Sequence, residues 1–97
     1  MPARGTNVSV GMAARIWRRD KGMCAYCGGA GGEVDHVVPR KYGGPTTPAN
    51  LVISCRSCNH KKKGRLDMDW TTRGISALIA AGEDTSWMDD FHPRPYA

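Results

Sequence analysis

Two groups of residues in this sequence have the types and spacing that chemistry requires. The first is a pair of Cys-x-x-Cys motifs, Cys24 with Cys27 and Cys55 with Cys58, which together hold all 4 cysteines. Four thiolates in this pattern are typical of tetrahedral zinc, because two intervening residues let one tight turn present both sulfurs. Two disulfides or a redox pair are the alternatives, but a redox motif needs no second copy and no βαβ pattern surrounds either pair. We therefore expect structural zinc.

The second group lies between the cysteine pairs, in the stretch VDHVVPRKYGG at residues 34–44. Its valines favour a strand, whereas Asp35 and His36 would be costly to bury without partners. Histidine suits a general base near neutral pH, and a carboxylate offers the hard oxygen that Mg²⁺ or Mn²⁺ prefers. Neighbouring strand residues point to opposite faces, so Asp35 can turn toward a metal while His36 approaches from the other side if the strand bends there. The alternative is that the two side chains pair with each other or cap a turn.

The elements that must position these groups follow from hydrophobic periodicity, with Gly and Pro as breaks. The gap between the cysteine pairs, residues 28–54, is longer than the roughly 15–20 residues of a plain zinc ribbon, so both strands fit inside it. After a loose N-terminus at residues 1–9, we expect a helix over 10–21, strands over 33–38 and 51–54, a short basic helix over 58–65, a helix over 72–81 ending at Gly82, and a tail.

Composition limits the class of protein. A chain of 97 residues is one domain with a thin core, which a metal often supports, and its formal charge of +5 favours a polyanionic partner. No run of 18 apolar residues is present, so we expect no membrane span, and the N-terminus lacks the apolar region of a secretory signal. We therefore expect a cytoplasmic protein, in a compartment where thiols stay reduced and bind metal.

In chain order, the segments CAYC, VDHVVP, GG and NLVISCRSCNHKKKG resemble the HNH nucleases, in the branch whose ββα-metal finger is held by a four-cysteine zinc site. The resemblance covers residues 24–65. It implies an α+β fold: a small zinc-stabilised ββα-metal (HNH) domain with flanking helices. Residues 66–97 carry no match to the family, and their own pattern predicts a C-terminal helix and tail. The resemblance also implies a DNA endonuclease with His36 as the base and one divalent ion, leaving 5′-phosphate and 3′-hydroxyl ends. Small phage and mobile-element nucleases are similar, which would place the protein in a host cytoplasm, with a packaging terminase as a candidate partner.

The resemblance extends to the asparagines. Asn50 occupies the family position that ties the loop together and orients the base, and an Asn side chain by itself often bonds nearby backbone groups. The family most often has histidine directly after the final cysteine, whereas this sequence has Asn59 there and His60 next. We predict that Asn59 binds the catalytic ion with Asp35, because the family's ligand-x-x-Lys spacing is met by Asn59 and Lys62. His60 is the alternative; an Asn oxygen suits Mg²⁺, and a His nitrogen would favour Mn²⁺, Ni²⁺ or Zn²⁺.

Basic residues around the expected metal site are candidate phosphate contacts, which position DNA without reading its sequence. They are Arg40, Lys41, Arg56, Lys61, Lys62, Lys63 and Arg65. A charge run is more often a solvated face, and Arg15, Arg18 and Arg19 either extend this footprint or solvate the first helix. The tryptophans and Phe91 are expected in the core, and His92 on the surface. The main alternative function is a non-catalytic zinc-finger module that binds nucleic acid, although a pure binder has no need of the Asp35–His36 pair.

Overall fold

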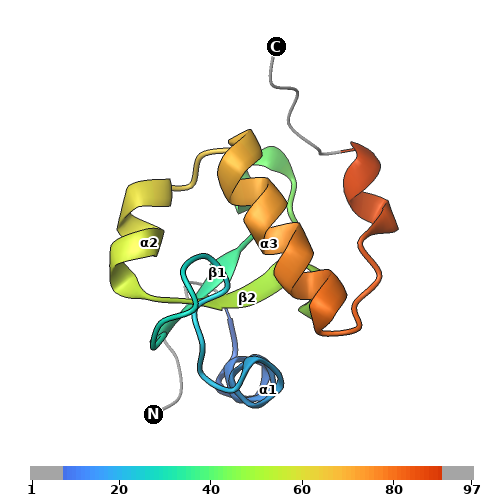
Figure 1. Ribbon diagram of the computed structural model, residues 1–97. Helices are drawn as coiled ribbons and strands as arrows, with labels where there is room; N and C mark the ends of the chain where they lie inside the picture. The colour runs from blue at the N-terminus through green and yellow to red at the C-terminus, as the bar shows by residue number, and fades with distance from the viewer. Residues whose placement is uncertain (1–7, 91–97) are drawn as a thin grey trace.

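The computed structural model of the chain describes residues 8–90 (Figure 1). Phe91, His92 and most of the expected loose N-terminus lie outside this range. The elements in chain order are α1 (Val10–Asp20), β1 (Glu33–His36), η1 (Arg40–Tyr42), η2 (Pro48–Asn50), β2 (Leu51–Ser54), α2 (Arg56–Lys62), α3 (Met68–Ala80) and η3 (Ser86–Asp90). Helices combined with a two-stranded antiparallel sheet confirm the expected α+β class.

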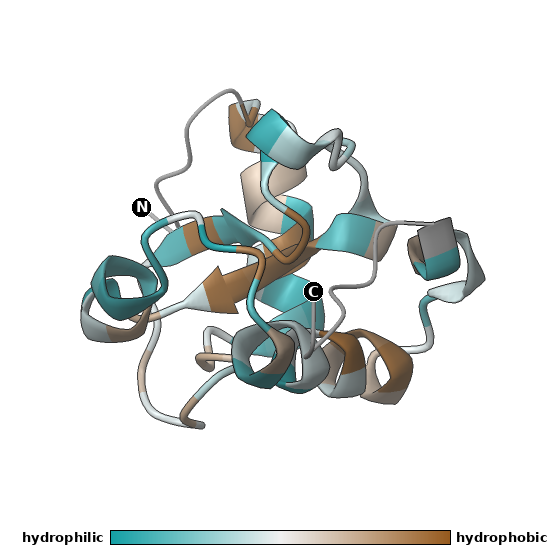
Figure 2. Cartoon of the chain, turned by 90° about the horizontal axis from the view of Figure 1, so that it is seen from above, coloured by the Kyte–Doolittle hydropathy of each residue, from teal (hydrophilic) through white to brown (hydrophobic). Residues whose placement is uncertain are grey.

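The hairpin of β1 and β2 is the centre of the fold, and it pairs Asp35 with Val52 and His36 with Leu51. Helices cover both faces of β2. Leu51 and Ile53 pack in one apolar cluster with Ala13 and Ile16 of α1, and Val52 packs in a second cluster that includes Leu78 of α3. Figure 2 shows the hydrophobic strand at the centre, with helices of mixed hydropathy around it. Because both faces of β2 are covered, its sequence is a continuous apolar run without alternation.

The end of α1 is fixed to β2 by two charged residues, Arg19 and Asp20. The guanidinium of Arg19 donates to the carbonyl oxygens of Pro48 at 2.8 Å and Leu51 at 2.6 Å, and it also pairs with Asp20. Asp20 Oδ2 accepts the backbone N–H of Ile53 at 3.0 Å. Neither role expected for Arg19, a DNA contact or a solvated charge, is correct, because its donors are used inside the fold. Arg15 and Arg18 are exposed.

Three of the expected elements have different boundaries in the structure. β1 ends at His36 rather than Val38, because the side chain of Asn50 takes the N–H of Val38. α2 spans residues 56–62 rather than 58–65, because Cys55 caps its start and Lys63 adopts a left-handed conformation at its end. α3 begins at Met68 rather than Thr72, because Asp67 accepts the N–H groups of Asp69 and Trp70.

The tryptophans pack against the core, as expected: Trp17 against the α1 cluster, and Trp70 and Trp87 against the α3 cluster. Gly82 follows α3 with a φ of 84°, the left-handed conformation typical of a glycine after a helix. Within residues 8–90, no helix has the length and apolar character needed to cross a membrane.

Candidate active site and cysteine cluster

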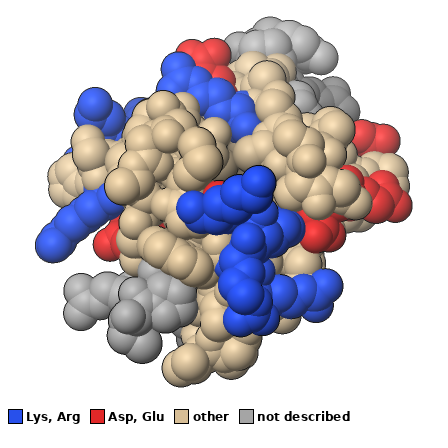
Figure 3. Space-filling view, turned by 60° about the horizontal axis from the view of Figure 1, so that its bottom comes forward, with Lys and Arg blue, Asp and Glu red and all other residues tan. Residues whose placement is uncertain are grey.

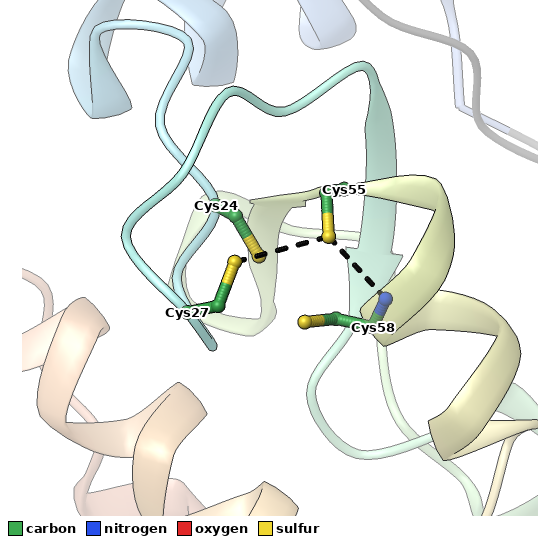
Figure 4. A group of neighbouring side chains, drawn as sticks. All are labelled: Cys24, Cys27, Cys55 and Cys58. Carbon is green, nitrogen blue, oxygen red and sulfur yellow. Dashed lines mark hydrogen bonds between the residues drawn. The ribbon is translucent and has the colours of Figure 1, made fainter.

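The cysteine pairs come together at one end of the hairpin. The four Sγ atoms lie within 4.8 Å of one another, and those of Cys27 and Cys55 are 3.9 Å apart. Figure 4 shows the four side chains converging, Cys24 and Cys27 from the loop after α1 and Cys55 and Cys58 from the start of α2. Zn–S bonds of about 2.3 Å in a tetrahedral site place sulfurs about 3.8 Å apart, so the cluster fits an ion such as zinc. All four thiols are free, which argues against the disulfide alternative.

Backbone N–H groups surround the sulfurs of the cluster. Tyr26 N donates to Cys24 Sγ at 3.4 Å, and Cys58 N donates to Cys55 Sγ at 3.3 Å. Burial raises the pKa of the Cys24 thiol, but backbone hydrogen bonds from Cys55, Tyr26 and Cys27 outweigh it and bring that pKa to about 7. Burial raises the pKa of Cys58. N–H donors of this kind stabilise thiolates, the form of cysteine that binds a metal.

Asp35 does not pair with His36; it meets two other side chains. Tyr26 Oη donates a hydrogen bond of 2.5 Å to Asp35 Oδ2, and Lys62 Nζ lies 3.1 Å from the same oxygen. Burial and the charge of Asp35 raise the pKa of Tyr26 well above its ordinary value, so the phenol stays a donor. Among the described residues, Oδ1 of Asp35 has no hydrogen-bond partner, which leaves it available as a ligand atom.

His36 has its own set of contacts, separate from those of Asp35. Its Nε2 lies 2.9 Å from Thr46 Oγ1, and its carbonyl oxygen accepts from Lys62 Nζ at 2.9 Å. Burial, with help from Arg40 and Lys62 and against the influence of Asp35, lowers the pKa of His36. The imidazole is therefore neutral at pH 7. With Nε2–H donated to Thr46, Nδ1 would be the nitrogen that can accept a proton.

Asn50 closes the loop that follows β1. It is fully buried, and its side chain accepts the N–H of Val38 at 2.8 Å and donates to the carbonyl oxygens of Val38 at 3.0 Å and Pro45 at 2.8 Å. Gly44 lies in the same loop, where any side-chain carbon would overlap the carbonyl of Val38. The loop is thus folded tightly onto the end of β1, and the same loop carries Thr46 to His36.

Asp35, His36 and Asn59 line one pocket of about 350 Å³, together with Arg40 and Lys41. His60 is exposed and lines a neighbouring pocket of about 300 Å³. The Nδ2 of Asn59 donates to Glu33 Oε1 at 2.8 Å, which leaves the amide oxygen without a partner in the described part of the chain. The structure therefore brings Asn59, rather than His60, together with Asp35 and His36, and it presents an oxygen on each of Asp35 and Asn59.

Lys62 is not the surface cation that its place in the lysine run predicts. Its side chain is 0% exposed and bonds only within the fold, so the prediction that Lys62 contacts DNA is wrong. An unpaired buried cation is costly, and Asp35 supplies the counter-charge. The other candidates stay exposed: Arg40, Lys41, Arg56, Lys61, Lys63 and Arg65. Figure 3 shows Lys and Arg side chains gathered in a band across one face.

Sequence reasoning missed three residues that hold the site in place: Glu33, Tyr26 and Thr46. A signal existed for Glu33, because alternate strand residues share a face and Glu33 and Asp35 are two apart. No comparable signal marked Thr46, which reaches His36 across a loop. The sequence shows Tyr26 only as a residue between two cysteines. Its contact with Asp35 depends on how the turn from Cys24 to Cys27, the first knuckle of the cluster, packs on β1.

Comparison with known proteins identifies a family match over the segment that contains the cysteine cluster and the candidate site. The family model described as HNH endonuclease matches residues 24–65, from the first cysteine of the cluster to just beyond α2. With the cysteine cluster, this match confirms the resemblance to the HNH nucleases. It supports nuclease activity in general, and the family implies a nucleic-acid substrate. Searches among curated proteins and among solved structures gave no match.

Proposed function

We propose that this protein is a metal-dependent DNA endonuclease, with His36 as general base and with Asp35 and Asn59 as ligands of one divalent ion, Mg²⁺ or Mn²⁺. The observation that supports this most strongly is the shared pocket, where a neutral imidazole, a carboxylate and an amide oxygen meet beside Arg40 and Lys41. A phosphodiester is an anion, so its hydrolysis needs a base for water and positive charge near the phosphate. The pocket holds groups of each kind.

Each residue then has a defined task. Nδ1 of His36 accepts a proton from water, whose oxygen forms a bond to phosphorus while the bond from phosphorus to the 3′ oxygen breaks. The leaving 3′ oxygen takes a proton from solvent, so the products would carry 5′-phosphate and 3′-hydroxyl ends. Thr46, as the acceptor of a hydrogen bond from Nε2–H, would keep Nδ1 unprotonated, and Asn50 holds the loop that carries Thr46. When bound, a divalent ion supplies positive charge for the developing negative charge on the leaving oxygen.

The cysteine cluster is proposed to hold structural zinc rather than to take part in the reaction. Four sulfur ligands close a tetrahedral zinc site and leave no open position for water or substrate. The cluster joins the loop after α1 to the start of α2, so it fixes Asn59, which follows Cys58 directly. A redox role would need cysteines that exchange, which a tightly held ion opposes.

A non-catalytic module that binds nucleic acid is the second candidate. It is favoured by one observation, the ion pair between Asp35 and Lys62, which gives Asp35 a structural reason to be present. It does not account for Nδ1 of His36 or the amide oxygen of Asn59, which have no hydrogen-bond partner among residues 8–90. A partner protein such as a packaging terminase stays a prediction from the resemblance.

Supercoiled plasmid tests the proposal. Zinc-loaded protein should convert it to nicked or linear DNA with Mg²⁺ or Mn²⁺ and should not do so when neither ion is added. Asp35→Asn leaves the buried Lys62 ammonium without its counter-charge, so its fold must first be checked by circular dichroism. The folded variant should still bind DNA but lose cleavage. DNA binding by the wild type without cleavage under any divalent ion would favour the module that only binds.

A further inference from the structure

Tyr26 links the cysteine cluster to the candidate catalytic ion site. It lies between Cys24 and Cys27, and its backbone N–H donates to Cys24 Sγ. Its ring is buried and packs edge-on against Trp70, with centroids 5.4 Å apart, while its hydroxyl reaches Asp35 Oδ2. The backbone of Tyr26 therefore forms part of the turn that carries Cys24 and Cys27, and its side chain contacts the carboxylate of Asp35 in β1.

Lys62 reaches the same oxygen of Asp35 from α2. The ammonium is fully buried and also bonds the carbonyl oxygen of His36, so it contacts both residues of the Asp-His pair. Two donors, one from the knuckle and one from α2, converge on Oδ2. A carboxylate held by one oxygen in this way has a fixed plane, and its second oxygen has a fixed direction.

We propose that Tyr26 and Lys62 are positioning residues that hold Asp35 by Oδ2 so that Oδ1 faces the divalent ion. This rests on the proposed function, in which Asp35 is an ion ligand, and it adds a role for the cysteine cluster: its first knuckle orients a ligand of the catalytic ion. Groups that bond to metal ligands commonly change metal affinity or activity by about 10–100-fold when removed.

The competing explanation is that Asp35 only satisfies a buried hydroxyl. Buried tyrosines usually have such a partner, so the bond would exist without any effect on ion binding. The two explanations differ in what removal of the hydroxyl does. A structural role changes stability alone, whereas a positioning role changes ion affinity in a protein that keeps its zinc and its fold.

The test is Mn²⁺ affinity, measured by the EPR signal of free Mn²⁺ in titrations of zinc-loaded protein. Tyr26→Phe should weaken Mn²⁺ binding at least tenfold, and cleavage should recover at high Mn²⁺ concentration. Tyr42→Phe is the matched control, because it removes the same hydroxyl from a half-exposed ring outside the pocket, and it should bind Mn²⁺ like the wild type. Asp35→Asn should abolish binding.

The outcomes separate the two proposals. If Asp35→Asn abolishes Mn²⁺ binding and Tyr26→Phe binds like the wild type, the inference is overturned and the proposed function stands. If Asp35→Asn binds like the wild type, the ion site itself is wrong. A second measurement needs no folded variant: in wild-type protein carrying ¹³Cζ-labelled tyrosine, saturating Mg²⁺ should shift the Tyr26 signal and leave that of Tyr42. An unmoved Tyr26 signal would also overturn the inference.

Discussion

Replacing each of the two asparagines of the site by alanine should have different effects: Asn50→Ala should lower stability, and Asn59→Ala should lower cleavage. Asn50 is fully buried and makes three hydrogen bonds, with the N–H and carbonyl of Val38 and the carbonyl of Pro45. Asn50→Ala leaves the buried N–H of Val38 without a partner, at a cost of about 1–3 kcal/mol, and loses two bonds to carbonyls worth about 0.5–1.5 kcal/mol each. The expected loss of unfolding free energy is about 2–6 kcal/mol, a large part of the roughly 5–15 kcal/mol of a small domain.

Asn59→Ala is the matched comparison, because the same atoms are removed from a half-buried position. Among residues 8–90 the side chain makes one hydrogen bond, to Glu33, so the expected loss of stability is about 0.5–1.5 kcal/mol. Its effect should appear in Mg²⁺-dependent cleavage, which Asn59→Ala should lose. Urea unfolding of the zinc-loaded proteins, followed by tryptophan fluorescence, measures the first quantity, and plasmid cleavage measures the second.

If Asn50→Ala unfolds within about 1 kcal/mol of the wild type, the three bonds do not hold the loop, and the tight path after β1 must have another cause. If Asn59→Ala is the less stable of the two, the assignment of structural and ion-binding roles is reversed.

Two further predictions concern the zinc cluster and the lysine run. Cys58→Ser should give an unfolded or insoluble chain, because zinc binding in such sites contributes roughly 10–16 kcal/mol, and elemental analysis finding no zinc in folded wild-type protein would contradict this. Lys63→Ala should reduce the salt dependence of DNA binding by about one unit of slope with little change in stability, whereas Lys62→Met should leave the slope unchanged and lower stability by about 3–5 kcal/mol. Equal slopes for the two variants would mean that Lys62 contacts phosphate after all.

The parts of the fold that depend on local patterns could be predicted from the sequence. The two cysteine pairs, the apolar strand of β2 and the amphipathic face of α1 each carry their own signal, and the structure has all three. The end of β1 could not be placed, because the residue that ends it, Asn50, is far along the chain and acts through a side-chain bond. The early start of α3 had a signal that was missed, since Asp67 is a favourable N-cap.

The charged residues show where pattern reasoning fails. Lys62 and Lys63 are neighbours in one basic run, yet one is fully buried and the other exposed. At the end of α1, Arg18 is exposed, whereas Arg19 is partly buried and bonds inside the fold. The direction of each side chain around the helix decides which of two neighbours is buried. That direction depends on how the helix packs on the rest of the domain, which residue composition does not predict. The partners of Asp35 were hidden for the same reason, because one comes from the knuckle and the other from α2.

The most direct test of the proposed nuclease compares two histidine variants at saturating DNA and Mg²⁺. His36→Ala should cleave about 10²–10⁴-fold more slowly than the wild type while binding DNA equally well, because a general base acts in the transition state. His60→Ala, the same substitution at an exposed position in the neighbouring pocket, should keep most of the activity. Cleavage by His36→Ala at the wild-type rate, or an equal loss in His60→Ala, would contradict the assignment of His36 as the base.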